Sequence, residues 1–570
     1  MTIGQFTFIL HTHLPYVLGH GKWPHGTDWL NEAAAECYVP LLRVLDRLAA
    51  DGVQPALTIG LTPVLLEQMA HPAFIEHFDE YLTQKIAASE NDEAEFGKTG
   101  DSKLRLATMW KNYYGEIRKH FHDTYGRDLI AAFRRHQDAG RIEIITCAAT
   151  HGYLPLLGSD EAVRAQVKTG VETYKKYFDR QPAGIWLPEC AYRPSYEWTH
   201  PVDFAGKRTF TRAGVEEVLH ENGLSYFIVD SHLLEGGKAI GAYIDRFDAL
   251  KRLWGQFEKS YTQIDGEPKT PQKTYLVSSK GGPKVAAILV RDPETALQVW
   301  SGEYGYPGDG NYLDFHKKHF PGGNRYWRVT GAKVDLGDKK EYNPDVIMGR
   351  VQENAGHFKD LIKQRLVDYK AKTGENGFLV APFDTELFGH WWFEGPEFLY
   401  HVCKWVADDP ELQPATGSSM IETNPPTEII ALPEGSWGEG GYHWIWLNEW
   451  TDWTWKHIYQ CEDKMTELAG KYGDSTDEII QRLLKQLARE LLLLEASDWQ
   501  FLISTWAARD YAEMRLGVHY EAFKRLVEII DNVAQNGDIA PTDLTYLDEL
   551  AERDSAFADV EPKHWAKIDA

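Results

Sequence analysis

Short apolar runs that end in polar or turn-forming residues recur through the first 400 positions of the chain. They predict seven strands, at residues 5–10, 55–61, 142–149, 183–188, 225–230, 285–291 and 377–383. Apolar positions at helical spacing lie between several of them, most clearly over residues 31–50, 161–178 and 350–371. This alternation predicts a parallel sheet, either a closed barrel or a doubly wound sheet. No Gly-x-Gly-x-x-Gly motif follows the first strand, which argues against a dinucleotide-binding fold.

The spacing of the strands also predicts how the chain is divided. Residues 73–138 separate strands two and three and predict a small inserted helical domain. Residues 231–284 predict a long connection that contains a mobile loop. Strand signals stop near residue 405, and strong helical patterns follow at 475–496 and 507–535. We therefore expect a barrel domain over residues 1–405 and a C-terminal helical domain over residues 406–570.

Composition narrows the class of protein. A chain of 570 residues with 43% hydrophobic and 25% charged positions is typical of a globular protein of two or three domains. Its 60 basic and 85 acidic residues give a net charge of -25, which disfavours nucleic-acid and membrane partners. The five cysteines include no Cys-x-x-Cys pair, which indicates reduced thiols rather than disulfides or structural zinc. With no basic leader or long apolar run, we expect a cytoplasmic location.

Titratable side chains gather where the predicted strands end. In a parallel barrel these ends meet on one face, where catalytic residues are found. The set is His11, His13, His151, Glu189, Asp230, His232, Arg291, Asp292, Asp384 and Glu386. One or two of these can be turn or salt-bridge residues, and Asp292 before Pro293 is the clearest example. So many titratable groups on one face predict an active site there. We expect Glu386 to lie behind the residues that line this site.

Two chemistries fit this set. His11, His13, His151 and Asp384 follow the ligand order of a metal-dependent amidohydrolase, in which a bound metal activates water. That interpretation leaves Glu189 without a task. Alternatively, Glu189 and Asp384 act as paired carboxyl groups across a glycosidic bond, one ionised and the other protonated. The histidines are then hydrogen-bonding neighbours.

The distribution of tryptophan favours the second chemistry. Six of the 20 tryptophans fall between residues 437 and 455, and Trp391 and Trp392 follow Asp384 closely. Packing of a helix and a turn explains about half of them, since indole rings bury large areas. The glycine-rich residues 438–441 predict a loop beside Trp437, and flat rings on such a loop suit stacking on sugars.

Five motifs, taken together and in order, resemble glycoside hydrolase family 57, and most closely its 1,4-α-glucan branching enzymes. They are His11-Thr-His-Leu-Pro-Tyr16, His151-Gly-Tyr-Leu-Pro-Leu156, Ile185-Trp-Leu-Pro-Glu-Cys-Ala-Tyr192, Ala381-Pro-Phe-Asp-Thr-Glu-Leu-Phe-Gly-His390 and the segment from Trp437 to Trp455. The resemblance covers residues 5 to about 530. It implies an incomplete (β/α)7 barrel with an inserted helical domain and a C-terminal helical domain over the cleft.

The resemblance also implies roles for single residues. Glu189 matches the family's nucleophile and Asp384 its general acid/base in a retaining reaction, which needs carboxyl groups roughly 5 Å apart. No metal or cofactor is expected at this centre. The residues that match sugar-binding positions are His11, His13, His151, Trp300, Trp437 and Trp446. Asp230 is a further candidate sugar ligand, with orientation of its neighbours as the alternative.

The acceptor that reaches the covalent intermediate decides which activity results. A glucan 6-hydroxyl gives a branching enzyme of glycogen-type metabolism, which is our expectation. Water gives an α-amylase and a 4-hydroxyl gives a 4-α-glucanotransferase, and these remain the alternatives. Branching members are thought to use a tyrosine at the tip of the loop after strand five, and Tyr243 is the candidate. We expect an α-glucan as the partner and a monomer or small homo-oligomer.

Overall fold

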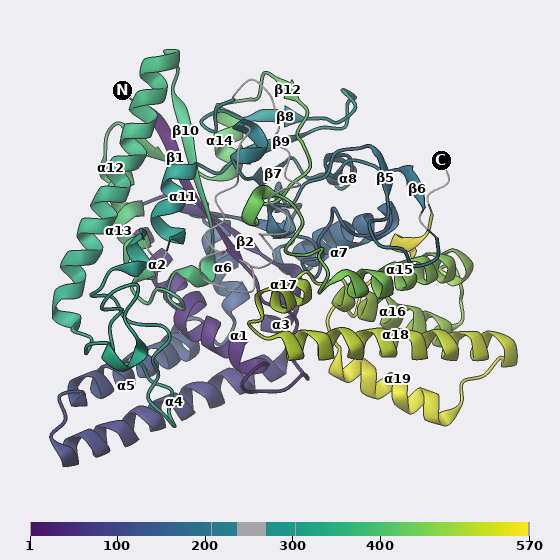
Figure 1. The fold of residues 1–570 in the computed structure, drawn as a ribbon, viewed down its shortest axis with the longest axis horizontal. Coiled ribbons are helices and arrows are strands. Elements are labelled where there is room, and N and C mark those ends of the chain that lie inside the picture. Colours follow the sequence, from purple (N-terminus) through teal and green to yellow (C-terminus); the bar gives the residue numbers. More distant parts are fainter. Residues whose placement is uncertain (1, 207, 236–268, 302–303, 568–570) are drawn as a thin grey trace.

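Seven parallel strands form the centre of the molecule in a computed structural model, which describes residues 2–206, 208–235, 269–301 and 304–567 (Figure 1). They are β1 Gly4–Thr12, β2 Leu57–Leu61, β3 Ile142–Cys147, β4 Gly184–Trp186, β7 Tyr226–Val229, β9 Ala286–Val290 and β10 Gly377–Asp384. Their order in the sheet is β10-β1-β2-β3-β4-β7-β9, and a bridge between Arg291, directly after β9, and Val380 of β10 joins the first and last of the seven. All seven predicted strands are present, and the incomplete (β/α)7 barrel is confirmed.

Alternation along the strands decides which side chains enter the barrel. In β1, Phe8 and Leu10 belong to the large outer core, and the Phe8 ring stacks on Phe358 with centroids 5.7 Å apart. Ile9 belongs to a second cluster, whose other strand members come from β3, β4, β7, β9 and β10. Only the interior of a barrel brings those strands together. His11, two residues after Ile9, therefore lies on the inward side at the end of β1.

The outer layer consists of helices between the strands. The predicted helices at 161–178 and 350–371 are α7 Asp160–Phe178 and α12 Ile347–Thr373, which runs beside β1 and β10 in Figure 1. The predicted helix at 31–50 begins earlier and contains a π-helical turn, as α1 Thr27–Ala33, η1 Ala34–Tyr38 and α2 Val39–Ala50. The remaining helices around the sheet are α3 Pro63–Ala70, α8 Val215–Glu221, α9 His232–Glu235, α11 Pro293–Trp300, α13 Gly395–Asp408 and α14 Gly417–Thr423.

The segment predicted as an inserted helical domain is helical. It contains α4 Pro72–Thr99, α5 Leu104–Lys119 and α6 Leu129–Asp138. Gly100 ends α4 in the left-handed conformation that glycine adopts without strain, and α5 then packs along α4. The buried Trp110 of α5 donates a hydrogen bond from Nε1 to the carbonyl of Arg325, 2.6 Å away. That residues 73–138 form a separate domain stays a prediction.

Four short strands were not predicted from the sequence, and a fifth lies in the expected long connection. They are β5 Glu197–Thr199, β6 Thr209–Thr211, β8 Tyr275–Val277, β11 Leu412–Pro414 and β12 Ile429–Ile430. β11 pairs with β1 and β12 with β8, so the prediction that strands stop near residue 405 is wrong. Runs of two or three residues are too short to show an alternating pattern. The division of the chain at residue 405 stays a prediction.

The C-terminal part is helical, as predicted, and lies at the lower right of Figure 1. It comprises α15 Asp452–Tyr472, α16 Glu478–Leu494, α17 Asp498–Thr505, α18 Arg509–Asn536 and α19 Pro541–Arg553. The leucines of α16 are buried against α15 and α18, so this stripe is core. Among the described residues, no helix combines the length and apolarity needed to cross a membrane. All five cysteines are buried and free.

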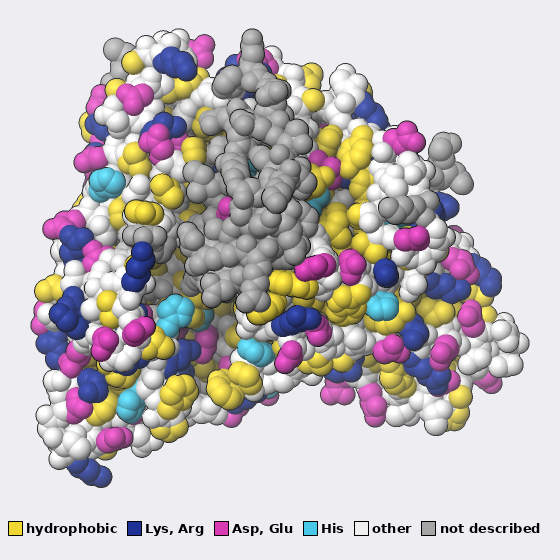
Figure 2. Space-filling view, in the orientation of Figure 1, with side chains coloured by type: hydrophobic (Ala, Val, Ile, Leu, Met, Phe, Trp, Pro, Cys, Tyr) yellow, Lys and Arg dark blue, Asp and Glu magenta, His cyan; other side chains and the backbone are white. Residues whose placement is uncertain are grey.

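A buried ionic network joins these helices to the segment after β1. Arg515 of α18 donates hydrogen bonds to the carbonyl oxygen of Tyr16, at 2.6 Å, and to the hydroxyl of Tyr511. His519 lies between Arg515 and the carboxylate of Glu490. Removing a hydrogen-bond partner from the buried guanidinium leaves its charge unsatisfied, so the network fixes the two parts relative to each other. On the outer face shown in Figure 2, acidic and basic side chains are interspersed.

Gly389 sits where the β10 loop meets the π-helical turn, and this contact yields a prediction. Its φ is +121°, and a Cβ there would lie 1.8 Å from the carbonyl oxygen of Glu36. We expect Gly389→Ala to lower the free energy of unfolding by about 3 kcal/mol or more, because backbone must move. Gly517→Ala is the matched control, since Gly517 lies within α18 with open space around it. It should stabilise by roughly 0.5–1 kcal/mol. Equal shifts of the two melting temperatures would contradict this assignment.

Candidate active site

One cavity of about 250 Å³ at the carboxyl ends of the strands brings together seven of the ten predicted site residues. These are His11, His13, His151, Glu189, Asp384, Trp437 and Trp446. Two of the remaining three lie nearby: Trp300 contacts Trp437 edge-on at 5.6 Å, and Asp230 pairs with Arg291, whose guanidinium faces the Trp437 ring. The third, Tyr243, lies outside the described residues.

Glu189 occupies a strained turn directly after β4. Its φ is +60° and that of Cys190 is +47°, in the left-handed region that non-glycine residues rarely adopt. Two hydrogen bonds from Trp437 hold this turn. Its backbone N–H donates to the Glu189 carbonyl at 3.1 Å, and its indole Nε1 donates to Glu189 Oε2 at 2.8 Å. Strained backbone persists only where the surroundings enforce it, which is common at active sites.

The environment of Glu189 moves its pKa into the neutral range. Desolvation in the cavity raises the pKa to about 7, the hydrogen bond from Trp437 opposes the rise, and the charge of Asp498 adds to it. A carboxyl group that titrates near pH 7 can serve as a base, a nucleophile or an acid. Its position in a cavity makes it a candidate functional group.

Two further carboxyl groups share the cavity. Asp384 ends β10, and desolvation, together with the charges of Glu386 and Glu189, holds its pKa well above the usual range. Glu386 accepts a hydrogen bond from the hydroxyl of Tyr38 at 2.9 Å, and burial raises its pKa to about 7. Glu386 therefore faces the cavity rather than lying behind its wall. Like charges so close together cannot all be ionised, so at least one group holds a proton.

Three imidazoles line the same cavity and differ in charge. His11 and His151 face each other with their Nε2 atoms 3.0 Å apart, and burial lowers the pKa of both well below the usual value. His13 contacts Thr62 through Nδ1 and Asp498 through Nε2, at 3.0 Å. Although burial works against it, Asp498 raises the pKa of His13. His11 and His151 are thus neutral hydrogen-bonding groups, while His13 and Asp498 form a charge pair.

Asp230 has a different environment from the cavity carboxyl groups. Burial opposes its ionisation, but the guanidinium of Arg291 holds its pKa far below the usual range. His232 approaches the same carboxylate at 3.4 Å and contacts the carbonyl oxygen of Gly441 through Nε2. Asp230 is therefore a permanently charged partner of Arg291, and its sugar-binding role stays a prediction.

The tryptophan-rich segment divides into cavity wall and core, as the composition suggested. Trp437 and Trp446 line the cavity, and Trp446 is stacked on Tyr153 with centroids 4.5 Å apart. Trp444 and Trp455 are buried in the core. Trp391 also lines the cavity although it is 36% exposed, so it lies where a long ligand could enter.

The residues that sequence reasoning missed come mainly from α17. Asp498 and Phe501 line the cavity, and Ser497 contacts His151 Nδ1 through Oγ at 2.9 Å. Their signal is weak, because Ser-Asp at the start of a short helix is the ordinary pattern of a helix N-terminus. Asp498 also lies 485 positions from His13 along the chain. Only the tertiary structure brings the helical C-terminal part into the site.

Comparison with known families agrees with this arrangement. The family model described as "Glycosyl hydrolase family 57" matches residues 7–433, three-quarters of the chain. The chain belongs to glycosyl hydrolase family 57. A second family model, "1,4-alpha-glucan branching enzyme, C-terminal", matches residues 457–565. The part of the cavity wall that α17 supplies lies within this match.

Relatives and solved structures place the chain within family 57. It is 43% identical to 1,4-alpha-glucan branching enzyme TK1436 of Thermococcus kodakarensis, over 98% of this chain and 78% of the relative. It matches the crystal structure of a family 57-type branching enzyme from Pyrococcus horikoshii with a TM-score of 0.88 and 39% identity, over 100% of this chain and 98% of that chain. The alpha-amylase AmyC of Thermotoga maritima matches over the whole of both chains with a TM-score of 0.79 and 28% identity.

The bond from Trp437 to Glu189 yields a prediction about pH dependence. A hydrogen bond to a carboxylate favours its ionised form, so its loss raises the pKa. In Trp437→Phe, we expect the pKa of Glu189 to rise, so that the acidic limb of the kcat/KM profile moves to higher pH if activity needs the ionised carboxylate. Trp453→Phe is the control, since the indole of Trp453 donates to the carbonyl of Trp450. An acidic limb that stays in place or moves to lower pH would contradict the prediction.

Proposed function

We propose that this protein is a retaining 1,4-α-glucan branching enzyme. The observation that carries the proposal is that Glu189 and Asp384 share one cavity whose wall comes partly from α17, within the branching-enzyme C-terminal match. Relatives named as branching enzymes also cover nearly the whole chain. Paired carboxyl groups with separated protonation states are the general equipment for retaining glycoside cleavage.

The surroundings of the two carboxyl groups support different roles. Glu189 accepts the indole N–H of Trp437, which favours its ionised form and suits a nucleophile. Asp384 lies beside Glu386 and Glu189, which favours its protonated form and suits a general acid. In this assignment, a Glu189 oxygen attacks the anomeric carbon while Asp384 gives its proton to the departing 4-oxygen. A covalent glucosyl ester on Glu189 results.

The second half of the reaction reverses the protonation of Asp384. Its carboxylate takes the proton of a glucan 6-hydroxyl as that oxygen attacks the anomeric carbon, and the ester bond to Glu189 breaks. The product is an α-1,6 branch with the original anomeric configuration. Double displacement requires the carboxyl groups to stand roughly 5 Å apart, and this separation stays a prediction.

Exclusion of water separates branching from hydrolysis. The cavity wall includes Trp391, Ile445, Trp446 and Phe501, whose apolar faces can seat an acceptor sugar and leave little room for water. We propose that Trp300, Trp437 and Trp446 stack on sugar rings and that His11, His13, His151 and Asp230 bind hydroxyl groups. Tyr243 is proposed as the loop-tip residue that shields the intermediate.

The amidohydrolase alternative finds no support. It would use His11, His13, His151 and Asp384 as metal ligands, but the carboxylate next to His13 is Asp498. The neighbours that set the pKa of Asp384 are Glu386 and Glu189. Family 57 membership also favours glycoside chemistry.

The setting of the enzyme follows from the same proposal. Its substrate is a neutral α-glucan, which suits the net charge of -25 and a glycogen-type metabolism. Five free cysteines suit a reducing compartment, so we propose a cytoplasmic location. A monomer or small homo-oligomer is proposed.

The direct test follows bond formation on amylose by proton NMR. We expect new α-1,6 anomeric signals to exceed new reducing ends, because the 6-hydroxyl outcompetes water. Glu189→Gln and Asp384→Asn should each lower the rate by about 10³-fold or more, since they remove the nucleophile and the acid/base. The exposed Glu422→Gln is the matched control and should keep full activity.

Other outcomes of this test have different meanings. Reducing ends without α-1,6 signals would replace branching with amylase activity, as in the Thermotoga maritima relative. Wild-type activity in Glu189→Gln would overturn the assignment of the nucleophile. New β-anomeric signals would overturn the double displacement.

A further inference from the structure

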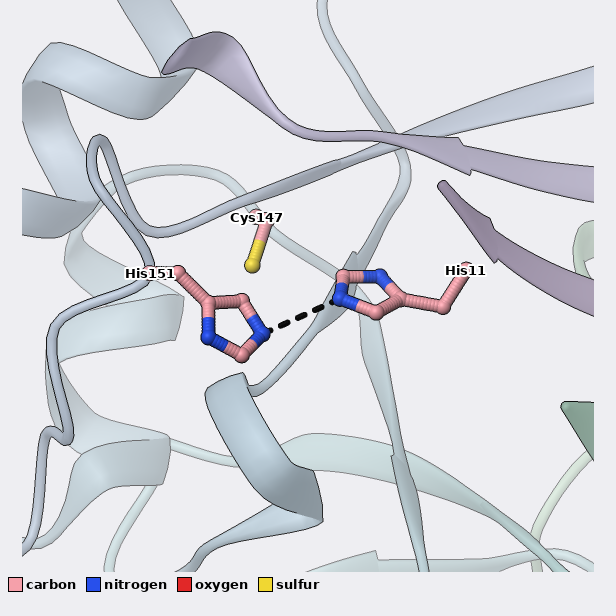
Figure 3. Close-up of side chains that lie close together, drawn as sticks. All are labelled: His11, Cys147 and His151. Atoms are coloured by element: carbon pink, nitrogen blue, oxygen red, sulfur yellow. Dashed lines mark hydrogen bonds between the residues drawn. The ribbon is translucent and has the colours of Figure 1, made fainter. Parts of the chain in front are cut away.

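A thiol lies beside the two neutral imidazoles of the cavity and has no task in the proposed reaction. Figure 3 shows Cys147, at the end of β3, with its sulfur pointing toward the rings of His11 and His151. One ligand atom from each residue lies within 4.8 Å of the other two. All three residues are buried. The three side chains therefore already lie together inside the protein.

The two imidazoles can offer their Nε2 atoms to a ligand once the hydrogen bond between these atoms is broken. With the Nε2 atoms 3.0 Å apart, one of them must carry a proton and the other accept it. His151 Nδ1 contacts Ser497 Oγ, which can accept a hydrogen bond, and His11 Nδ1 is a buried nitrogen with no hydrogen-bond partner in the described residues. With both protons on Nδ1, the two Nε2 lone pairs become free for one ligand, and only His151 then has an Nδ1 hydrogen-bond partner among the described residues.

Two imidazole nitrogens and a thiolate are a ligand set for a borderline or soft metal ion. Zn²⁺ binds imidazole at about 2.0–2.1 Å and thiolate at about 2.3 Å, and is tetrahedral. Two nitrogens on one tetrahedral zinc are roughly 3.3 Å apart, so the imidazoles need to separate by only a few tenths of an ångström. Water or a sugar hydroxyl from the cavity can supply the fourth ligand.

We propose that His11, Cys147 and His151 form a Zn²⁺-binding site in the wall of the cavity, and that the bound ion inhibits the enzyme by competing with the glucan. On binding, each imidazole ligates through Nε2 with its proton on Nδ1, and the Cys147 thiol releases one proton to the buffer. No oxidation is involved. An occupied site removes His11 and His151 from the sugar, with Glu189 Oε1 only 4.0 Å from His151 Nδ1.

Two other clusters of possible ligands fit a metal less well. His13, His151 and Asp498 also converge, but His13 and Asp498 are already paired with each other at 3.0 Å. His20, His519 and Asp554 converge in the buried ionic network. There, the guanidinium groups of Arg515 and Arg553 contact His519 and Asp554, and these cations oppose a metal ion.

The test is isothermal titration of Zn²⁺ into the full-length protein in two buffers of different ionisation enthalpy. We expect one tight site and one proton released per zinc. Cys147→Ser should weaken zinc binding and abolish the proton release. The loss should exceed the about 10- to 100-fold that is typical when a residue that only supports a metal ligand is removed. Cys403→Ser, another buried free cysteine, is the matched control and should bind zinc as the wild type does. These measurements do not depend on the reaction that the enzyme catalyses.

Three further readouts decide the location and consequence of the site. Asp498→Asn should keep the zinc affinity, whereas its loss would place the ion at His13 and overturn the proposal. Co²⁺ added to wild-type protein should give a near-ultraviolet thiolate charge-transfer band, which tests the ligand set without any variant. Its absence would overturn the role of Cys147. Zinc should raise KM for amylose and leave kcat unchanged, and a fall in kcat alone would overturn competition.

Discussion

The site depends on the two hydrogen bonds that Trp437 donates to Glu189. A glutamate at a φ of +60° is unfavourable, and the turn keeps this conformation because a backbone bond and an indole bond from Trp437 both anchor it. The strained turn aims the carboxyl group into the cavity instead of along the strand. The indole N–H also opposes the effect of desolvation on its pKa. One residue, 248 positions away, therefore both anchors Glu189 and moderates the rise of its pKa.

The site is complete only when the C-terminal helices are docked on the barrel. Asp498, Ser497 and Phe501 of the α17 region reach the histidines or the cavity wall, and Asp498 controls the charge of His13. The Arg515 network joins α18 to the segment after β1, which carries His13 at its start. A buried guanidinium that donates to a backbone carbonyl is well suited to this task, because loss of the hydrogen bond leaves its charge unsatisfied. Stability of the interface and geometry of the site are thus coupled.

The parts of the fold that could be predicted from the sequence are those with a local signal. Alternating or continuous apolar runs identified all seven barrel strands, and polar residues at their ends identified three of the four carboxyl groups and all three histidines of the cavity. Strands as short as β12 carry too few residues for a pattern. Asp498 looks like an ordinary helix N-terminus, and the placement of Glu386 depends on Tyr38 in a π-helical turn. Such residues gain their roles from tertiary contacts alone.

Binding a neutral sugar sets conditions that explain the remaining features of the cavity. Uncharged imidazoles can donate and accept hydrogen bonds to hydroxyl groups, and burial keeps His11 and His151 uncharged by lowering their pKa. The same neutral nitrogens are the form of histidine that binds metal ions. Cys147 stands beside them because the end of β3 lies two strands from the end of β1 in the sheet. A cavity built to hold neutral imidazoles for a glucan therefore also presents a soft ligand set to a cation.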